Sequence, residues 1–334
     1  MSKARTVRFH AHGGPEVLRI EDVEVGEPGP GELLLRVEAI GINRAEALFR
    51  GGHYIEPVRR FPARLGLEAS GVVEAVGEGV TGFVAGQAVS VVPSFSMNDH
   101  GVYAERAVVP ASSVVPRPEG LGAVEAAAVW MPYVTAYGGL VEVGGLRAGD
   151  TVVLTAASSS VGLAAIRTAH RVGAVPVATT RTRAKRDALL RAGAAEVIVT
   201  EEEDLAERVL ALTDGRGADL AFDAVAGPGV TDLVRAVAPG GTVLLYGGVS
   251  GLPTPYPAFD LGMPAVSLRT YTMPETTRDP ERLRRARAFV ESGLRTGAVE
   301  PAVDRTFPLD AIVSAHRALE AGHQVGKIVV TVPH

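Results

Sequence analysis

The sequence contains no cysteine among its 334 residues. Such a chain can form no disulfide, no thiolate nucleophile and no cysteine-ligated zinc site. Long apolar runs are missing too: no stretch reaches the roughly 18 apolar residues that span a bilayer, and the first residues, MSKARTVRFHAHGG, lack the apolar core of a secretory signal. We therefore expect a cytoplasmic protein without membrane segments.

A basic charge excess is also absent, because the formal net charge is -5. Nucleic-acid binders need a basic face to neutralise phosphates, so we expect no nucleic-acid partner. A hydrophobic content of 46% over 334 residues is enough to build cores for about two domains.

Two kinds of pattern divide the chain. Residues 1–125 hold short strand-like runs among many Gly, Pro and Val residues, which is typical of a β-rich unit. From Val124 a helical run extends to residue 143, and apolar strands then alternate with helices. The strands are expected at residues 151–156, 175–180, 196–200, 218–225 and 241–248. This alternation predicts an α/β fold with a doubly wound parallel sheet. A charged helix over 278–297, a further helix and a last strand follow.

The turn after the strand TVVLTA keeps only the last glycine of the dinucleotide-binding pattern G-x-G-x-x-G. Small residues in the helix behind it still permit close packing on the sheet, and Ala157 can make the tight turn if its φ stays negative. Serine hydroxyls can cap the helix and add hydrogen bonds toward a pyrophosphate. The predicted cofactor contacts are Ala157, Ser158, Ser159, Ser160, Val161 and Gly162. A capped turn that binds nothing is the alternative.

Basic residues follow the next strand, VPVATT, where an NAD enzyme places an acid against the ribose 2′-hydroxyl. They crowd the start of a helix, the end at which the helix dipole disfavours cations, so an anionic ligand is expected there. A 2′-phosphate fits, which predicts NADPH over NADH. The assigned residues are Thr180, Arg181, Arg183 and Lys185. A solvated basic face is the alternative for one or two of the four cations, most of all for Arg186.

Several motifs occur in an order that resembles the medium-chain dehydrogenase/reductase superfamily, in its zinc-free quinone oxidoreductase-like branch. They include GINRAEALFRGGHY, PARLGLEASGVVEAVGEGV, MPYVTAYGGL, AGDTVVLTAASSSVGLAAI, APGGTVLLYGG and GHQVGKIVV. The resemblance covers essentially the whole chain. It implies a GroES-like β-rich catalytic domain, residues 1–125 and 291–334, and a Rossmann NADPH-binding domain, residues 126–290.

The resemblance also implies roles for single residues. Asn43 and Tyr54 match the substrate-facing pair that would stabilise a developing oxyanion. Further residues are implied to wall the substrate cleft or to bind the cofactor: Trp130 and Tyr133 for the cleft, and Thr135, Gly247, Gly248 and Lys327 for the cofactor. Other interpretations stay open. Asn43 could only hold a turn, Tyr54 could be a half-buried aromatic, and Trp130 and Tyr133 could be ordinary core contacts.

The sequence departs from the zinc enzymes of the superfamily. Leu67 stands where they carry a histidine ligand, and no pair of the eight histidines has the helical i, i+4 spacing of a metal site. We therefore expect no metal. Glu68, retained beside the lost ligand, is expected to brace an internal ion pair.

Without a metal to polarise a carbonyl, hydride must go to an acceptor that is already activated. We therefore expect an NADPH-dependent oxidoreductase of quinones or α,β-unsaturated carbonyls. An enoyl-thioester reductase and a catalytically silent NADPH-binding protein are the alternatives. A homodimer is expected through residues 265–273, a strand placed beyond the sixth Rossmann strand, where the matching superfamily segment pairs with its two-fold mate.

Overall fold

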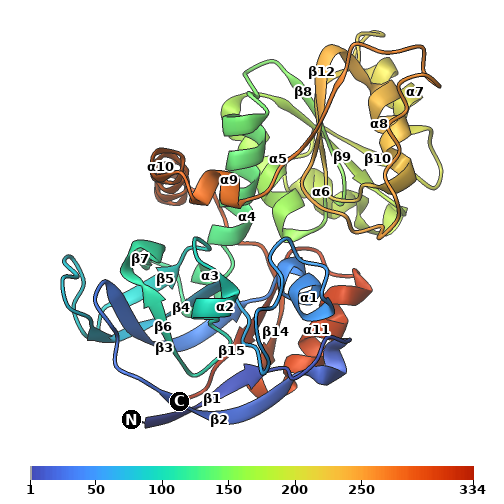
Figure 1. The fold of residues 1–334 in the computed structure, drawn as a ribbon. Helices are drawn as coiled ribbons and strands as arrows, with labels where there is room; N and C mark the ends of the chain where they lie inside the picture. The colour runs from blue at the N-terminus through green and yellow to red at the C-terminus, as the bar shows by residue number, and fades with distance from the viewer. Residues whose placement is uncertain (1) are drawn as a thin grey trace. The chain divides into compact units, whose positions relative to one another are not determined.

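The computed structural model describes residues 2–334 (Figure 1). The chain divides into two compact units. Unit 1 joins the residues up to Met131 to Pro301–His334, and unit 2 is Pro132–Glu300. The sequence placed these boundaries at 125/126 and 290/291.

Unit 1 is β-rich, as its short strand-like runs predict. Its strands are β1 (Ser2–Arg8), β2 (Arg19–Val25), β3 (Glu32–Gly41), β4 (Glu68–Val76), β5 (Ala88–Val91), β6 (Arg106–Pro110), β7 (Val114–Pro116), β14 (Val303–Pro308) and β15 (Lys327–Thr331). Strands β1 and β2 form a separate hairpin-like sheet. The main sheet runs β14-β15-β3-β4-β5-β7, and β6 also pairs with β3. The carboxyl-terminal segment thus completes a sheet begun by the first third of the chain.

Short helices connect these strands: α1 (Arg44–Gly51), α2 (Met97–His100), α3 (Ala123–Ala126), α11 (Ile312–Ala321), and the 3-10 turns η1 (Pro15–Val17), η2 (Ala111–Ser113) and η6 (Leu309–Ala311). Helix α1 begins after Asn43, whose backbone N–H donates to the Glu46 carboxylate at 2.8 Å. It ends at Gly52, which has φ +79°. Both ends follow the usual rules for capping a helix.

Unit 2 is built on a parallel sheet whose strand order is β10-β9-β8-β11-β12-β13. Its strands are β8 (Thr151–Leu154), β9 (Val175–Thr180), β10 (Glu196–Val199), β11 (Ala218–Asp223), β12 (Val237–Leu245) and β13 (Ser267–Thr270). Its helices are α5 (Ser160–Val172), η4 (Arg183–Lys185), α6 (Arg186–Arg191), α7 (Leu205–Leu212), η5 (Gly227–Gly229), α8 (Val230–Ala236), α9 (Pro274–Thr277) and α10 (Pro280–Thr296). This is the doubly wound order of a Rossmann fold, with its switch point between β8 and β11.

The central strand β8 is buried along its whole length, because helices cover both faces of the sheet. Figure 1 shows α7 and α8 together on one face. The predicted fold class, a β-rich unit and a parallel doubly wound unit, is therefore confirmed. The C-terminal ends of β8, β9 and β11 meet at one edge, where open α/β sheets bind their ligands.

Four local features differ from the expectations. The helical run over 124–143 is three pieces, α3, α4 (Trp130–Tyr137) and a π-helical turn η3 (Gly138–Val143). A Cβ at Gly139 would lie 2.4 Å from the Phe222 ring, so close packing on the sheet shapes this segment. Strand β14 was not predicted, because the polar sequence VDRTFP has no alternating pattern.

The third correction concerns residues 265–273. Strand β13 is itself the sixth strand of the sheet, because only β8 to β12 precede it. It pairs in parallel with β12 and lies at the edge. The predicted boundary at 290/291 also falls inside α10. That helix is tied to unit 2 by the ion pair between Arg285 and Glu142, at 2.7 Å.

Candidate functional site

The turn after β8 joins the strand tightly to α5 although it lacks two glycines of the dinucleotide-binding pattern. Ala157 is not among the residues with positive φ, as the expected tight turn required, and the left-handed residue is its neighbour Ala156, with φ +45°. Ser159 is the N-cap of α5, and its hydroxyl accepts from the Gly162 N–H at 3.1 Å. A Cβ at Gly162 would lie 2.5 Å from the Cα of Ala157. The one retained glycine is therefore required, because the turn and the helix meet there without room for a side chain.

Helix α5 presents its amino end at this turn. The cap satisfies the third N–H of the helix, whereas the N–H groups of Ser160 and Val161, at its first two positions, have no partner within the helix. Together with the positive end of the helix dipole, these donors favour an anion. Ser158, Ser159, Ser160 and Val161 are all partly accessible. These residues fit the diphosphate of a dinucleotide.

A cation from the neighbouring loop reaches the same turn. The Nζ of Lys185, at the end of η4, donates to the hydroxyl of Ser158 at 3.1 Å. The basic run after β9 and the serine-rich turn after β8 were predicted separately, and the fold brings them into contact. A lysine at this position adds a full positive charge beside the amino end of α5.

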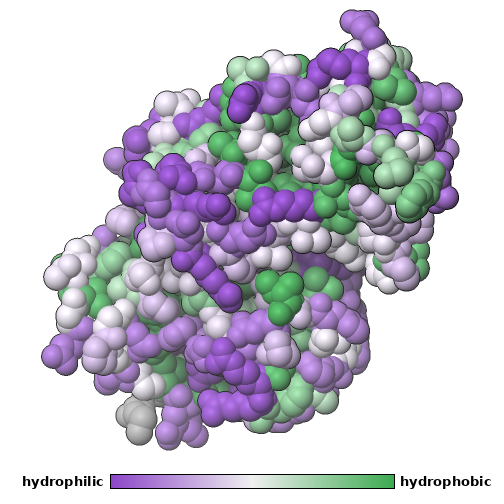
Figure 2. All heavy atoms as spheres, turned by 45° about the horizontal axis from the view of Figure 1, so that its top comes forward, coloured by the Kyte–Doolittle hydropathy of each residue, from purple (hydrophilic) through white to green (hydrophobic). Residues whose placement is uncertain are grey.

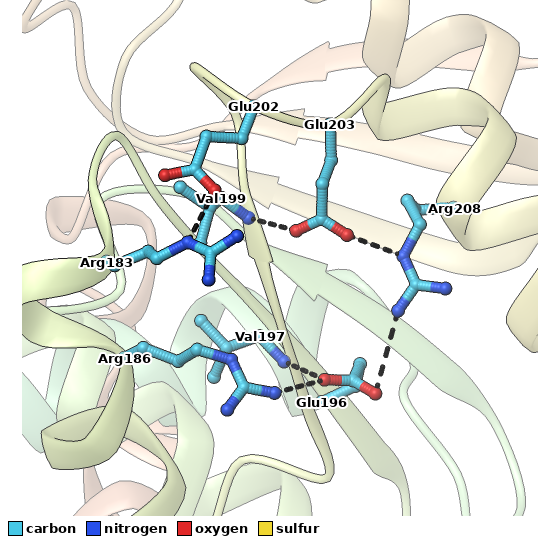
Figure 3. A pocket seen from close by; sticks show the side chains of 8 residues that line it. All are labelled: Arg183, Arg186, Glu196, Val197, Val199, Glu202, Glu203 and Arg208. Atoms are coloured by element: carbon cyan, nitrogen blue, oxygen red, sulfur yellow. Dashed lines mark hydrogen bonds and ion pairs between the residues drawn. The ribbon is translucent and has the colours of Figure 1, made fainter.

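The other three cations behave differently. Arg181 is exposed. Arg183 forms an ion pair with Glu202 at 2.6 Å, and Arg186 forms one with Glu196 at 3.4 Å (Figure 3). Both carboxylate partners lie far from the basic run in the sequence: β10 supplies Glu196, and the loop after β10 supplies Glu202. The alternative left open for Arg186, that it lies on a solvated face and binds no ligand, agrees with its pairing with Glu196. The predicted phosphate role of Arg183 requires it to leave or share Glu202.

Asp223 is a functional candidate that sequence reasoning missed. It ends β11 at the switch point and is 1% exposed. Its carboxylate accepts from the hydroxyl of Thr155 and from the backbone N–H groups of Val225, at 3.0 Å, and Ala226, at 2.7 Å. It thereby fixes the loop after β11 against the turn after β8. Its place at the carboxyl end of a buried strand was the available signal.

The remaining predicted cofactor residues of unit 2 lie on separate elements. Thr135 lies on α4 and is buried, and Thr180 ends β9 with its hydroxyl donating to the carbonyl of Thr182 at 3.2 Å. Gly247 and Gly248 follow β12. A Cβ at Gly247 would lie 2.7 Å from the carbonyl oxygen of Ala224, so this loop packs on the one that Asp223 fixes. Their cofactor contacts stay predictions.

Unit 1 contains a buried charged cluster around Lys327. The Nζ of Lys327 donates to Glu68 at 2.5 Å and to the Oδ1 of Asn43, and Lys327 and Glu68 are 1% and 0% exposed. The second oxygen of Glu68 accepts from the backbone N–H of Met131 at 2.8 Å. The expected internal ion pair of Glu68 is confirmed. The ammonium of Lys327 neutralises Glu68 in this structure, and its predicted cofactor contact stays a prediction.

Both side-chain amide hydrogens of Asn43 are already engaged in hydrogen bonds. The Nδ2 group donates to the carbonyl of Gly41 at 3.1 Å and to Glu46 at 3.2 Å, which uses both of its hydrogens. The predicted donation to a substrate oxygen would require one of these bonds to break. The geometry agrees with the other interpretation, in which Asn43 holds the turn before α1.

Burial governs the protonation of this cluster. Desolvation raises the pKa of Glu46 to about 7, against the opposing effects of Lys327 and Asn43. Desolvation also raises the pKa of Glu68, and the Lys327 ammonium opposes this. The cluster therefore combines the contact of Lys327 with Glu68 and one carboxyl, Glu46, that is close to its midpoint near neutral pH.

The three aromatic residues predicted near the substrate have distinct surroundings. Tyr54 is half-buried and packs edge-on against Phe49, with ring centroids 6.2 Å apart. Trp130 is fully buried in unit 1. Tyr133 is 2% exposed, and its hydroxyl donates to the backbone carbonyl of Glu300 at 2.8 Å. Tyr54 is thus the most accessible of the three, while Trp130 and Tyr133 act as core residues.

Within residues 2–334, no group of three or more His, Asp or Glu side chains is placed to hold a metal ion. Within the same residues, none of the helices combines the length and the apolar composition that crossing a membrane requires.

Comparisons with known proteins assign the family. Residues 29–119 match the alcohol dehydrogenase GroES-like domain, and residues 160–292 match a family described as zinc-binding dehydrogenase. A quinone oxidoreductase from Pseudomonas aeruginosa is 32% identical over 331 residues, covering 98% of this chain and 99% of its own length. A 2-haloacrylate reductase from a Burkholderia species is 29% identical over 328 residues, covering 96% and 97%.

Solved structures give the same result. An Escherichia coli quinone oxidoreductase complexed with NADPH has a TM-score of 0.90 at 28% identity, covering 98% of this chain and 99% of that one. A protein described as an NAD-dependent alcohol dehydrogenase has a TM-score of 0.89 at 32% identity, covering 98% and 100%. These similarities support an oxidoreductase with a nicotinamide cofactor. The chain belongs to the medium-chain dehydrogenase/reductase superfamily, in its quinone oxidoreductase-like branch.

Proposed function

We propose that this chain is an NADPH-dependent, zinc-independent oxidoreductase that transfers hydride to a quinone or to an α,β-unsaturated carbonyl. The observation that carries the cofactor proposal is the place of Lys185: it belongs to the basic run after β9, where the 2′-phosphate is proposed to bind, and it also reaches Ser158 of the turn after β8. NADPH, when bound, supplies a hydride to the acceptor. The chain's own residues bind its phosphates through the turn 156–162 and through Arg181, Arg183 and Lys185 of the basic run.

The proposal that the enzyme needs no zinc rests on residues of unit 1. Leu67 is buried at the position of the family's histidine ligand, and its backbone N–H donates to Glu46 at 3.1 Å. The neighbouring Glu68 is already neutralised by Lys327. An acceptor that needs no metal to activate it, such as a quinone or an enone, suits this arrangement. Tyr54 is proposed as the hydrogen-bond donor to the reduced oxygen, because it is half-buried and near the surface.

Elemental analysis tests the metal proposal. We expect no stoichiometric zinc and full activity after treatment with a chelator. Stoichiometric zinc, with activity lost to the chelator, would contradict it.

Substitution of Lys185 tests the cofactor proposal. A charge-assisted hydrogen bond contributes about 1.5–3 kcal/mol, so Lys185→Ala should weaken NADPH about tenfold or more and leave NADH little changed. Arg186→Ala is the matched control, because it removes one cation from the same segment but its partner is Glu196. Equal losses for both cofactors, or equal effects of the two substitutions, would contradict the assignment.

We also propose a homodimer joined along β13. This edge strand is mostly exposed, and unpaired edges are usually covered or paired. Just before it, five large apolar side chains are at least half exposed: Val249, Leu252, Tyr256, Phe259 and Met263. Figure 2 shows apolar surface on the part of the molecule that contains unit 2. A second copy related by a two-fold axis would cover the exposed edge of β13 and these apolar side chains together. The cytoplasmic location stays a prediction.

A further inference from the structure

The loop after β10 contacts the basic run that is proposed to hold the 2′-phosphate. The N–H of Thr200 donates to the carbonyl of Thr180 at 2.9 Å, and the N–H of Glu201 donates to the carbonyl of Arg181 at 3.2 Å. These bonds hold Glu202 beside Arg183 although the two residues lie on different loops. Any ligand at the carboxyl end of β9 therefore meets the loop that carries Glu202.

Three arginines and three glutamates line a pocket of about 290 Å³ at this edge (Figure 3). Arg183 pairs with Glu202 at 2.6 Å, Arg186 with Glu196 at 3.4 Å and Arg208 with Glu203 at 2.8 Å. The lining is thus neutral overall, because each cation faces a carboxylate. An anionic ligand would gain little binding free energy in this pocket unless one of the ion pairs opens.

The pair of Arg183 with Glu202 is the easiest of the three to open. The Arg183 side chain is 78% exposed, against 43% for Arg186 and 37% for Arg208. Solvent screens an exposed ion pair, so breaking it costs little. Glu203, by contrast, also accepts from the backbone N–H of Val199 at 2.8 Å. Arg183 is therefore the arginine of this pocket that can exchange its carboxylate for a phosphate.

We propose that Glu202 is a specificity-determining residue, which holds Arg183 away from the ribose 2′-phosphate and so limits the preference for NADPH over NADH. This inference rests on the proposed function, because it requires a 2′-phosphate at the end of β9. Glu202 competes with that phosphate for one guanidinium. NADH carries no 2′-phosphate, so its binding does not open the pair.

Calorimetric titration of the full-length chain with NADPH and with NADH tests the proposal. An exposed ion pair shifts an equilibrium about twofold to fivefold, so Glu202→Gln should tighten NADPH by that factor and leave NADH unchanged. Glu202→Asp, which keeps the charge, should bind NADPH as the unmodified chain does. The gain should shrink at high salt, because salt screens exposed charges.

Glu201→Gln is the matched control. It removes the same charge from the same loop, but Glu201 is not the partner of Arg183. An equal gain from both substitutions would overturn the proposal in favour of a general charge effect. So would unchanged NADPH affinity in Glu202→Gln. In an Arg183→Ala background the second substitution Glu202→Gln should have no effect, and a persisting gain would overturn the role of Arg183.

If the proposed function is wrong, the variants give a different pattern of cofactor affinities. In that case Lys185→Ala would weaken NADPH and NADH equally, whatever Glu202 does. If Lys185→Ala is selective for NADPH and Glu202→Gln changes nothing, only the inference about Glu202 fails.

Discussion

Replacing Lys327 with methionine should destabilise unit 1 strongly. The substitution leaves the Glu68 carboxylate fully buried without its counter-ion and removes the donor to Asn43. Breaking one partner of a buried ion pair costs about 3–5 kcal/mol, because the remaining charge stays desolvated. We expect a loss of this size in the free energy of unfolding of unit 1 at neutral pH.

The double variant separates lost charge pairing from lost packing. Glu68→Gln together with Lys327→Met removes both charges, so we expect it to recover about 2 kcal/mol or more of the loss. Lys3→Met is the control, because Lys3 is exposed on β1 and a surface change of this kind should stay within about 0.5 kcal/mol.

Denaturant unfolding followed by tryptophan fluorescence is a suitable assay. Trp130 is the only tryptophan and is fully buried in unit 1, so its signal reports this unit. Removing Lys327 raises the pKa of Glu68 further, and a carboxyl with a raised folded-state pKa loses stability as the pH rises. The deficit of Lys327→Met should therefore grow from about pH 4.5 upward. A loss below about 1 kcal/mol, or a deficit independent of pH, would refute the reasoning.

Further predictions concern Glu46, the turn after β8 and the edge strand. Because burial raises the pKa of Glu46 from 4.5 to about 7, the stability of unit 1 should fall as the pH rises through this window, and Glu46→Gln should flatten that slope; an unchanged slope would contradict the assignment. Gly162→Ala should destabilise unit 2 by about 1–3 kcal/mol, because its Cβ would overlap Ala157. It should also weaken the binding of NADPH and of NADH alike, and a loss of affinity for NADPH alone would contradict this. Light scattering should give twice the 34.7 kDa of one chain, and a single-chain mass at micromolar concentration would exclude the dimer. Arg269→Pro should dissociate the dimer, and a dimer that survives would place the interface elsewhere.

The fold was predictable because the two patterns that indicate it, apolar strand runs and the glycine at the start of α5, depend on residues that are close together in the sequence. Runs such as TVVLTA and VPVATT are apolar and β-branched, since strands buried on both faces have no polar side to show. The retained Gly162 marked the close approach of α5 to its strand. The π-helical turn that begins at Gly138 was not predictable, because Gly138 packs closely on Thr276 and Gly139 on Phe222, and both partners are distant in the sequence.

The site was predictable only in part, because its pairings are long-range. The basic run after β9 was recognised, but its neutralisation by Glu196 and Glu202 depends on a neighbouring strand. In the same way, the proposed donor Asn43 proved to be held by Glu46 and Lys327, and the latter lies at the far end of the chain. Sequence showed which side chains are unusual, whereas the fold decides which of them are already satisfied.

Turnover with a panel of acceptors tests the central claim most directly. The full-length chain would be assayed with NADPH and with NADH against a simple para-quinone, a small enone and an enoyl thioester. We expect cofactor oxidation with the quinone or the enone, and kcat/KM at least about tenfold higher with NADPH, as one charge-assisted phosphate contact would give. Bound NADPH without turnover on any acceptor, or equal use of both cofactors, would contradict it.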